Sequence, residues 1–389
     1  MSETTYYFDY AASAPRRPEV ADAMAPWMHG VVGNPSGTHR EARRARAAIE
    51  EARDVVADFV GGNVHDVVFT GGGTESCYLA IAGRVHAHRR DHPLSDIVIS
   101  PVEHSAVKKT AELLAATYED VRVRTLEVDR DGVVTSESLW DNLGPRTALV
   151  SVMTIQNETG VFQPLPVVAT LTAGAVPGGG VSHTDAIAAA SHMYLGPSTE
   201  AIDLVTIAAH KLGGPVNSGA LILRREVELV VPNQGGGQER GHRGGTVDVA
   251  AAVGLAAACR ATALERSEVL ERIEAFRLRF ENAVSYIAGV TVTARGESRI
   301  AGVTHLTVDG VSNEELIYLL DEAGVCVSGG SSCASGALEP SHVLLAMGYS
   351  PELARSAVRF SYGHLTTMEE IDYAIGALAD AVYRLRGQK

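Results

Sequence analysis

The sequence predicts an α/β protein with two domains, a larger one built on a mainly parallel, seven-stranded sheet and a smaller α+β unit. Seven short, apolar, β-branched segments lie between residues 66 and 224, and several are separated by segments long enough for a helix. Alternating strands and helices imply crossover connections and therefore a parallel sheet. The chain, at 389 residues, is also too long for one ordinary core, which favours two domains.

The first part of the chain contains the clearest elements. Residues 40–60 have helical spacing, with Ile49, Ala52, Val56 and Phe59 on one face. Further helices are expected at 74–90 and 105–120, and strands at 66–70, 96–100, 121–128, 147–153, 181–186, 204–210 and 219–224. Most of these strands are apolar throughout, as in a sheet that is buried on both faces. The last two are joined too tightly for a crossover, which predicts an antiparallel portion.

The second part of the chain predicts the smaller unit. Residues 248–285 are expected to form one or two long helices, with a domain hinge among them. A strand follows in "VTHLTVDG", and helices follow in "NEELIYLLDEAG" and "MEEIDYAIGALADAVYRL". We expect a large domain over residues 16–258 and a small domain made of residues 1–15 and 259–389.

Composition argues against several classes of function. The net charge of −14 disfavours nucleic acid or an anionic membrane surface as a partner. The four cysteines, which contain no C-x-x-C pair, form neither a disulfide framework nor a structural zinc site, and we expect no metal. We find neither a signal-peptide pattern nor an apolar segment long enough to span a membrane. Together these features predict a protein of the reducing cytoplasm.

A glycine-rich turn, "FTGGGTES", follows the first strand of the sheet and opens a helix. Backbone N–H groups at a helix start, with no side chains in the way, bind anions such as phosphate. The pattern is not a P-loop, because no Gly-Lys-Ser/Thr follows. The segment is equally consistent with a tight strand-to-helix turn that binds no ligand.

Two further strand ends carry polar residues. "SHTDA" places Asp185 at one, and "IAAHK" places His210 and Lys211 at another. Ligands of open α/β sheets bind at such ends. An anion-binding turn, a carboxylate and a lysine suit pyridoxal phosphate (PLP), because the lysine can form a Schiff base and the carboxylate can pair with the pyridinium nitrogen. The alternative, a surface lysine at a strand end, is weakened by Gly213 and Gly214 behind it.

The chain resembles the cysteine desulfurases, fold-type-I PLP enzymes of the class V aminotransferase group. The resemblance covers nearly the whole chain, and its motifs occur in the family's order: "YFDYAASAP", "GNPSGTHREAR", "VVFTGGGTES", "VEHSAV", "QNETGV", "HTDA", "AHKLGGP", "GGGQERGHRGGT" and "SGGSSCASGALEPSHVL…VRFSYG". Each motif alone is weak, but their combination is specific. The resemblance implies conversion of L-cysteine to L-alanine, with the sulfur passed to an acceptor such as an iron–sulfur scaffold.

The resemblance also assigns the cofactor-binding residues. Lys211 corresponds to the Schiff-base lysine and Asp185 to the partner of the pyridinium nitrogen, while His104 corresponds to the imidazole that stacks on the ring and assists proton transfer. The remaining cofactor contacts are implied for Gly73, Thr74, Asn157 and His210, and for Thr246, donated across a homodimer interface.

Substrate binding and sulfur transfer are assigned in the same way. Asn157 and Arg359 correspond to substrate ligands, because the planar guanidinium of an arginine suits a carboxylate. A helix-end salt bridge is the alternative for Arg359. Cys333 corresponds to the thiol that takes the sulfur as a persulfide, and its Gly/Ser surroundings suit a thiol that moves between the cofactor and an acceptor protein. An incidental thiol in a loop is the alternative.

Two positions depart from the family pattern. Ala188 stands where the family has a Gln that contacts the ring hydroxyl, and Ala208 stands where it has a Ser that binds phosphate. Each change removes a hydrogen bond worth about 1 kcal/mol. We therefore expect a cofactor that is held less tightly than is usual in the family.

Two other functions remain open on these residues. One is a related PLP-dependent C–S or C–Se lyase, or a sulfur donor dedicated to one pathway. The other is a non-catalytic partner that retains the fold and binds sulfur-transfer proteins. The joint presence of Lys211, Asp185, His104, Cys333 and Arg359 argues against the second.

Overall fold

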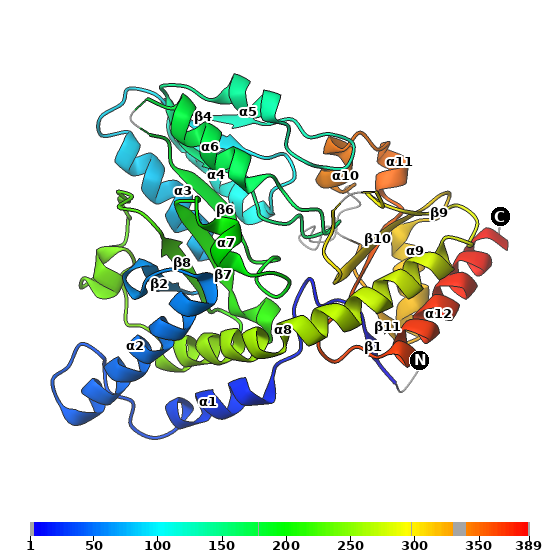
Figure 1. Ribbon diagram of the computed structural model, residues 1–389, viewed down its shortest axis with the longest axis horizontal. Helices are drawn as coiled ribbons and strands as arrows, with labels where there is room; N and C mark the ends of the chain where they lie inside the picture. Colours follow the sequence, from blue (N-terminus) through cyan, green and yellow to red (C-terminus); the bar gives the residue numbers. More distant parts are fainter. Residues whose placement is uncertain (1–3, 178, 297, 330–339, 388–389) are drawn as a thin grey trace.

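The computed structural model describes residues 4–177, 179–296, 298–329 and 340–387, and Cys333 lies outside these ranges. The central element is a seven-stranded sheet, at the left of Figure 1. Its strands, in spatial order, are β2 (Val67–Thr70), β8 (Gly219–Leu223), β7 (Leu204–Ala208), β6 (Ser182–Asp185), β5 (Thr147–Ser151), β3 (Ser95–Ile99) and β4 (Val121–Thr125). All seven predicted strands are therefore confirmed.

The direction of the strands also agrees with the prediction. The five strands from β7 to β4 are mutually parallel, whereas β8 is antiparallel to both of its neighbours, β7 and β2. The antiparallel portion arises where β7 and β8 are joined without a crossover helix, as the short connection predicts.

Helices cover both faces of the sheet, which explains why its strands are apolar throughout. One face packs against α2 (Arg40–Val60), α6 (Leu165–Ala175) and the first part of α8 (Val249–Val284); the other packs against α3 (Gly73–His88) and α4 (Ser105–Thr117). Alternate residues of β2 face opposite sides, since Val67 and Phe69 lie in the first core and Val68 in the second. The short α5 (Ser136–Asn142) and α7 (Leu195–Thr199) complete this part of the molecule.

A smaller α+β part lies beside the sheet, at the right of Figure 1. An antiparallel sheet in the order β12 (Ala357–Ser361), β10 (Val303–Val308) and β9 (Val290–Val292) packs against α9 (Asn313–Glu322), α12 (Met368–Gly387) and the end of α8. The N-terminal β1 (Tyr6–Tyr7) pairs in parallel with β11 (Val325–Cys326). The short α10 (His342–Ala346) and α11 (Pro351–Ala354) lie next to this sheet.

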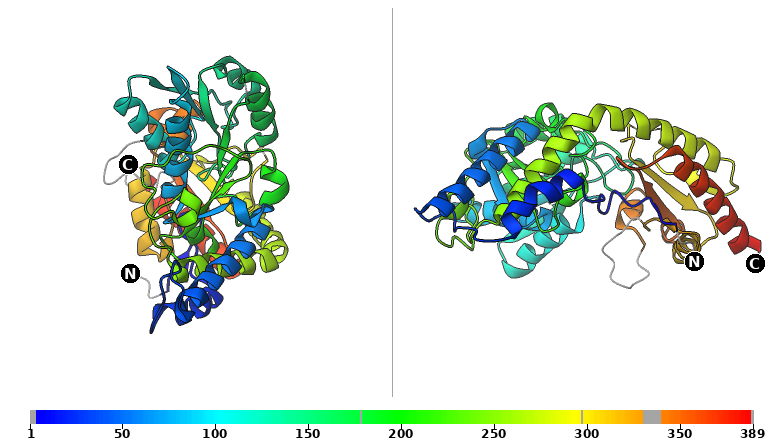
Figure 2. Two further views of the ribbon diagram at one scale, coloured as in Figure 1. Left: turned by 90° about the vertical axis from the view of Figure 1, so that its left-hand side faces the viewer. Right: turned by 90° about the horizontal axis from the view of Figure 1, so that it is seen from below.

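The long helix α8 connects the two parts. It runs for 36 residues without a break, where the sequence predicted one or two helices and a hinge. Its first residues, including Leu255 and Cys259, lie in the core of the large sheet, whereas Phe276 and Phe280 lie in the core of the small part. Figure 2 shows the helix passing across both parts. The chain between them is thus a rigid helix at this point.

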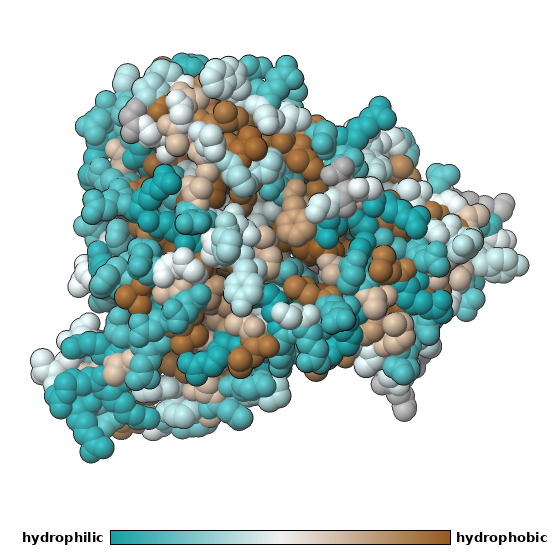
Figure 3. All heavy atoms as spheres, viewed as in Figure 1, coloured by the Kyte–Doolittle hydropathy of each residue, from teal (hydrophilic) through white to brown (hydrophobic). Residues whose placement is uncertain are grey.

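Helix α2 illustrates how the surface is built. Its apolar stripe, with Ile49 and Val56, is buried, and its charged residues face outward except Arg53, which is buried. Gly61 ends the helix with φ 65°, a left-handed conformation that favours glycine. Figure 3 shows the outer end of this helix as the hydrophilic lower left of the molecule. Within the described residues, we find no helix with both the length and the apolar character needed to span a bilayer.

Helix α1 (Pro18–Met28) packs against α8 at the base of the large part. Its first turn begins with Pro18, a residue that suits this position because the first helical N–H groups have no partner within the helix. The chain before α1 reaches the Lys211 segment, where the backbone N–H of Ala14 donates to the carbonyl of His210 at 2.9 Å. The N-terminal segment therefore closes one side of the region described next.

Candidate active site

A pocket opens at the carboxyl ends of the strands of the large sheet. This is where open α/β sheets bind their ligands. It brings together most of the residues that the sequence singled out. Its lining consists of Gly73, Thr74, His104, Ala106, Met153, Asn157, Asp185, Ile187, Ala188, His210 and Lys211.

The turn between β2 and α3 forms one wall of the pocket. Gly72 has φ 125°, which favours glycine, and a Cβ at Gly73 would overlap the side chain of Ile187. Thr70 Oγ1 and Ser76 Oγ lie 2.7 Å apart and tie the turn to the first turn of the helix. The backbone at the start of this 16-residue helix therefore faces the pocket without a side chain in between, as an anion site requires.

Asp185 supplies the negative charge of the pocket. It ends β6, next to Thr206 of β7, and only 4% of its surface is exposed. Its Oδ1 accepts a hydrogen bond from the backbone N–H of Ile187 at 2.9 Å, and its Oδ2 lies 3.9 Å from the thiol of Cys77. One oxygen is thus anchored by the backbone, while the other has only a long thiol contact within the described residues and suits a cationic ring nitrogen.

Glu103 is a second buried carboxyl that the sequence analysis missed. Its Oε1 accepts from the backbone N–H of Met153 at 2.6 Å, and we find no partner for Oε2 within the described ranges. Burial, and then the charge of Asp185, raise the pKa of Glu103 well above its ordinary value. In the sequence, only its position beside His104 could have indicated a role in the site. The burial of a single glutamate depends on residues far away in the sequence, so it cannot be read from the neighbouring residues.

His104 lies at the start of α4 and caps it. Its Nδ1 accepts from the backbone N–H of Ala106 at 3.1 Å, so the neutral ring carries its proton on Nε2. Burial lowers the pKa of His104; the charge of Asp185 opposes that effect, whereas those of Lys211 and His342 add to it. The ring is therefore a neutral group held by the cap in the wall of the pocket.

Lys211 and His210 lie in a short 3-10 turn, Ala209–Leu212, directly after β7. Gly213 ends this turn with φ 77°, and a Cβ there would lie 2.8 Å from Arg17. Burial, followed by the charges of Lys211 and His104, lowers the pKa of His210 to about 4. Lys211 is the one described residue that lines both this pocket and a second cavity between the two parts of the molecule.

Arg359 comes from the small part of the molecule and contacts Asn157 of the pocket wall, but it is not itself a lining residue. It lies in β12, not at a helix end, and its side chain is fully buried. One of its nitrogens donates to the carboxylate of Asp9 at 2.8 Å and another to the backbone carbonyl of Asn157 at 3.0 Å. Its Nε has no partner within the ranges described. The guanidinium therefore lies against the wall that Asn157 forms.

Three of the predicted site residues are not among the lining residues of the pocket: Arg359, Thr246 and Cys333. Thr246 lines a separate hollow beside Thr70 and Gly71, on the other side of the β2–α3 turn. Its loop is anchored by the buried ion pair between Arg53 and Glu239, at 2.8 Å. Cys333 lies outside the described residues, so its distance from the pocket is not part of this geometry.

Comparison with known proteins agrees with this arrangement. Residues 6–374 match the model of the family Aminotransferase class-V. The chain is 38% identical over 385 residues to the cysteine desulfurase IscS of Tolumonas auensis, covering 98% of this chain and 93% of the relative. It is also 38% identical to the IscS-like cysteine desulfurase of Mycobacterium tuberculosis, covering 98% and 97%.

Solved structures give the same result. A NifS-like protein superimposes with a TM-score of 0.90 at 27% identity, covering 98% of this chain and 100% of that one. A structure described as SspA in complex with cysteine superimposes with a TM-score of 0.80 at 30% identity, covering 92% and 99%. The family, the fold and the strand-end pocket agree, and the chain belongs to the aminotransferase class-V family and, within it, to the cysteine desulfurases.

Proposed function

We propose that the protein converts L-cysteine to L-alanine with PLP as cofactor and passes the sulfur, through a persulfide on Cys333, to an acceptor protein. The observation that carries this proposal is the convergence of an anion-binding turn, a buried carboxylate, a histidine and a lysine in one strand-end pocket. The two curated relatives described above, both cysteine desulfurases, and the cysteine complex of the solved relative support the same substrate.

The residues of the pocket fit PLP on their chemistry. The open β2–α3 turn, with Thr74 and His210, would hold the phosphate, and Asp185 would pair with the pyridinium nitrogen. Lys211 would hold the cofactor covalently. When bound, PLP draws electrons away from the amino-acid substrate, which makes its Cα proton and its C–S bond easier to break.

The remaining steps belong to the side chains of this chain. Arg359 and Asn157 would bind the substrate carboxylate, and Lys211 and His104 would move protons at the substrate. The thiolate of Cys333 would attack the substrate sulfur. The bond between that sulfur and Cβ of the substrate would break, and the carbon skeleton would take up a proton. L-cysteine and a thiol thereby give L-alanine and a persulfide, so atoms and electrons balance without an added oxidant.

We also propose a cytoplasmic homodimer in which Thr246 completes the phosphate site of the partner. The hollow that contains Thr246 is adjacent to the phosphate turn, and its residue Arg243 forms an ion pair with Glu75 at 2.9 Å, on the same turn. The acceptor could belong to iron–sulfur cluster assembly or to another sulfur-transfer route. Light scattering tests the dimer, which should have a molecular mass of twice 41.0 kDa.

The direct test is an assay of alanine and sulfide in one tube, with PLP, L-cysteine and a reductant. Equal yields are expected, and C333S should lose both products while it keeps the visible absorbance of bound PLP. C326S is the matched control, because Cys326 is half-buried on β11 and should be dispensable. Faster turnover of L-selenocysteine than of L-cysteine would instead indicate a C–Se lyase, and a protein that never takes up PLP would overturn the proposal.

A further inference from the structure

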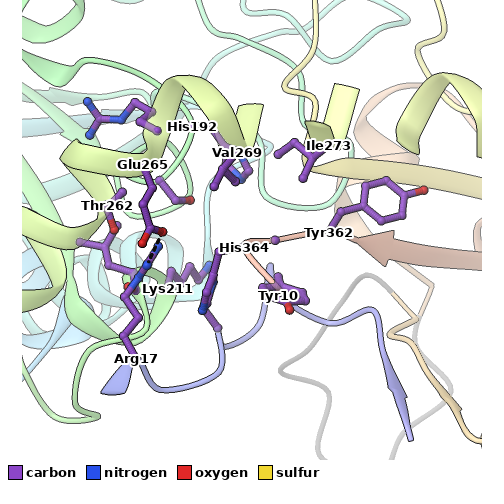
Figure 4. Close-up of a pocket in the computed structure, with 15 residues that line it drawn as sticks. Tyr10, Arg17, His192, Lys211, Thr262, Glu265, Val269, Ile273, Tyr362 and His364 are labelled. Carbon is purple, nitrogen blue, oxygen red and sulfur yellow. Dashed lines mark hydrogen bonds and ion pairs between the residues drawn. The ribbon is translucent and has the colours of Figure 1, made fainter. Parts of the chain in front are cut away.

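A second cavity lies on the other side of Lys211, between the large and small parts of the molecule. Figure 4 shows Arg17, Thr262 and Glu265 on one side of it and Ile273 and Tyr362 on the other. The proposed reaction uses none of these residues. The cavity therefore needs an explanation of its own.

Arg266, in the middle of α8, is the first residue that indicates a ligand for this cavity. Only 4% of its surface is exposed, and we find no carboxylate in ion-pair contact with it among the described residues. An arginine stays charged at any physiological pH, and a buried charge without a counter-ion costs several kcal/mol. Its stacking on Phe59 and Tyr194, at 5.0 and 4.6 Å from the ring centres, and a hydrogen bond to the backbone carbonyl of Ala190 at 3.3 Å offset only part of that cost.

Three hydrogen-bonding atoms of the cavity wall lack a partner within the described part of the chain. They are the Nε of Arg266, the hydroxyl of Thr262 and the Nδ1 of His192. Thr262 is also only 4% exposed and lies one helical turn before Arg266, on the same face of α8. Buried polar groups are normally paired, so unpaired donors around one cavity indicate a missing acceptor.

The charges of the cavity indicate the sign of that acceptor. Glu265 is the one carboxylate among the described lining residues, and it already pairs with Arg17 at 2.7 Å. Burial, and then the charges of Arg266 and Lys211, lower the pKa of His192 to about 4, so this ring is neutral at pH 7. Among the described residues that line the cavity, Arg266 therefore has no carboxylate to balance its charge.

We propose that this cavity binds a small monovalent anion, held by the hydroxyl of Thr262 and the guanidinium of Arg266, with His192 as a further donor. The anion would serve as the counter-ion of Arg266. Because residues of both parts line the cavity, the bound anion would also tie them together next to Lys211. The site is separate from the proposed reaction, and the proposal can fail while the desulfurase activity stands.

Thermal unfolding of the PLP-loaded protein tests the site without an activity readout. Sodium chloride and sodium formate serve as probes, and sodium gluconate at the same ionic strength controls for screening. We expect the melting temperature to rise by a few degrees and to saturate with chloride or formate, but not with gluconate, because a ligand of the native state stabilises it by mass action. Equal curves in all three salts would overturn the proposal.

Two variants locate the site. T262V removes one donor with little change in shape, and it should raise the half-saturating chloride concentration about ten-fold. T172V is the matched control, because Thr172 is also a buried threonine whose hydroxyl has no partner in the described chain, but it lies on α6 away from the cavity. An equal loss in both variants would contradict the assignment.

R266M should remove the stabilisation by chloride, so that the order of stability of wild type and variant depends on the salt. Without chloride, replacement of an unpaired buried charge by an apolar side chain should leave the melting temperature equal or higher. In saturating chloride the wild type should be the more stable protein. If R266M fails to fold in either salt, the comparison of T262V with T172V decides alone.

Discussion

The two cavities that share Lys211 differ in how their charges are balanced. The cofactor pocket combines a buried carboxylate, Asp185, with the open N-terminus of α3, so it offers one place for a cation and one for an anion. The cavity between the two parts has an arginine, Arg266, without a carboxylate partner among the described residues, and its one described carboxylate is already paired. The first therefore suits a ligand with charges of both signs, such as PLP, whereas the second suits an anion alone.

The two sites also differ in how they are built. The cofactor pocket lies at the strand ends of one sheet, where each side chain follows a buried strand. The second cavity is assembled from the N-terminal segment, α8 and the segments that follow β6, β7 and β12. A site made of strand ends can therefore be predicted from neighbouring residues in the sequence, because each side chain follows a recognisable strand. A site between packed units has no such local pattern.

The variant K211A gives the sharpest test of whether the two cavities function independently. We expect turnover to fall by about 10²–10⁴-fold, because Lys211 would hold the cofactor and move a proton. The absorbance of covalently bound PLP should disappear. The chloride dependence of the melting temperature should survive, since the donors of the anion site are intact. Loss of the chloride response together with the chromophore would show that the two cavities are one functional unit.

A second variant, R359K, examines the substrate side of the cofactor pocket. A lysine keeps the charge but cannot bind a carboxylate with two parallel bonds, so we expect KM for L-cysteine to rise about ten-fold while bound PLP absorbs as before. R90K, at the exposed pair of Arg90 with Glu228, is the control and should leave KM unchanged. A fall in kcat with an unchanged KM would argue against carboxylate binding.

The pH dependence of stability tests the buried carboxyl behind the cofactor pocket, Glu103, which accepts a hydrogen bond from the lining residue Met153. Its pKa is raised in the folded protein above the ordinary 4.5, so the folded state holds a proton that the unfolded state has released. Stability should therefore fall as pH rises from about 4.5 toward the folded-state pKa, by up to about 1.4 kcal/mol per pH unit. E103Q should show a flatter profile than the wild type in urea unfolding of the PLP-free protein. Parallel profiles would mean that Glu103 is ionised in its buried site.

The smallest effect is expected from A188Q. Ala188 lines the cofactor pocket where the family has a glutamine, and a restored hydrogen bond should tighten PLP binding by no more than about ten-fold. Titration of the PLP-free protein, followed by absorbance, measures the change. A173Q, at an exposed position of α6, should have no effect. Unchanged affinity in A188Q would contradict the expectation that PLP is held less tightly than usual.

Much of this molecule could be predicted from its sequence, and the exceptions have a common cause. The seven strands are apolar and β-branched, so their positions were correct, and the polar residues that follow them lie in one pocket. Glu103 and Arg266 were missed because charged residues are usually exposed. Their burial depends on Met153 and Phe59, which lie far away in the sequence. The roles of the site residues and the domain limits remain predictions.

The continuous helix α8 has a consequence for how the protein unfolds. A helix of 36 residues is about 54 Å long, and its two halves belong to different hydrophobic cores. Melting of either core would strip one half of the helix of its packing, and a helix in water is only marginally stable without packing. The two cores should consequently lose their structure together, and calorimetry should record a single cooperative transition for a chain that has two centres of packing.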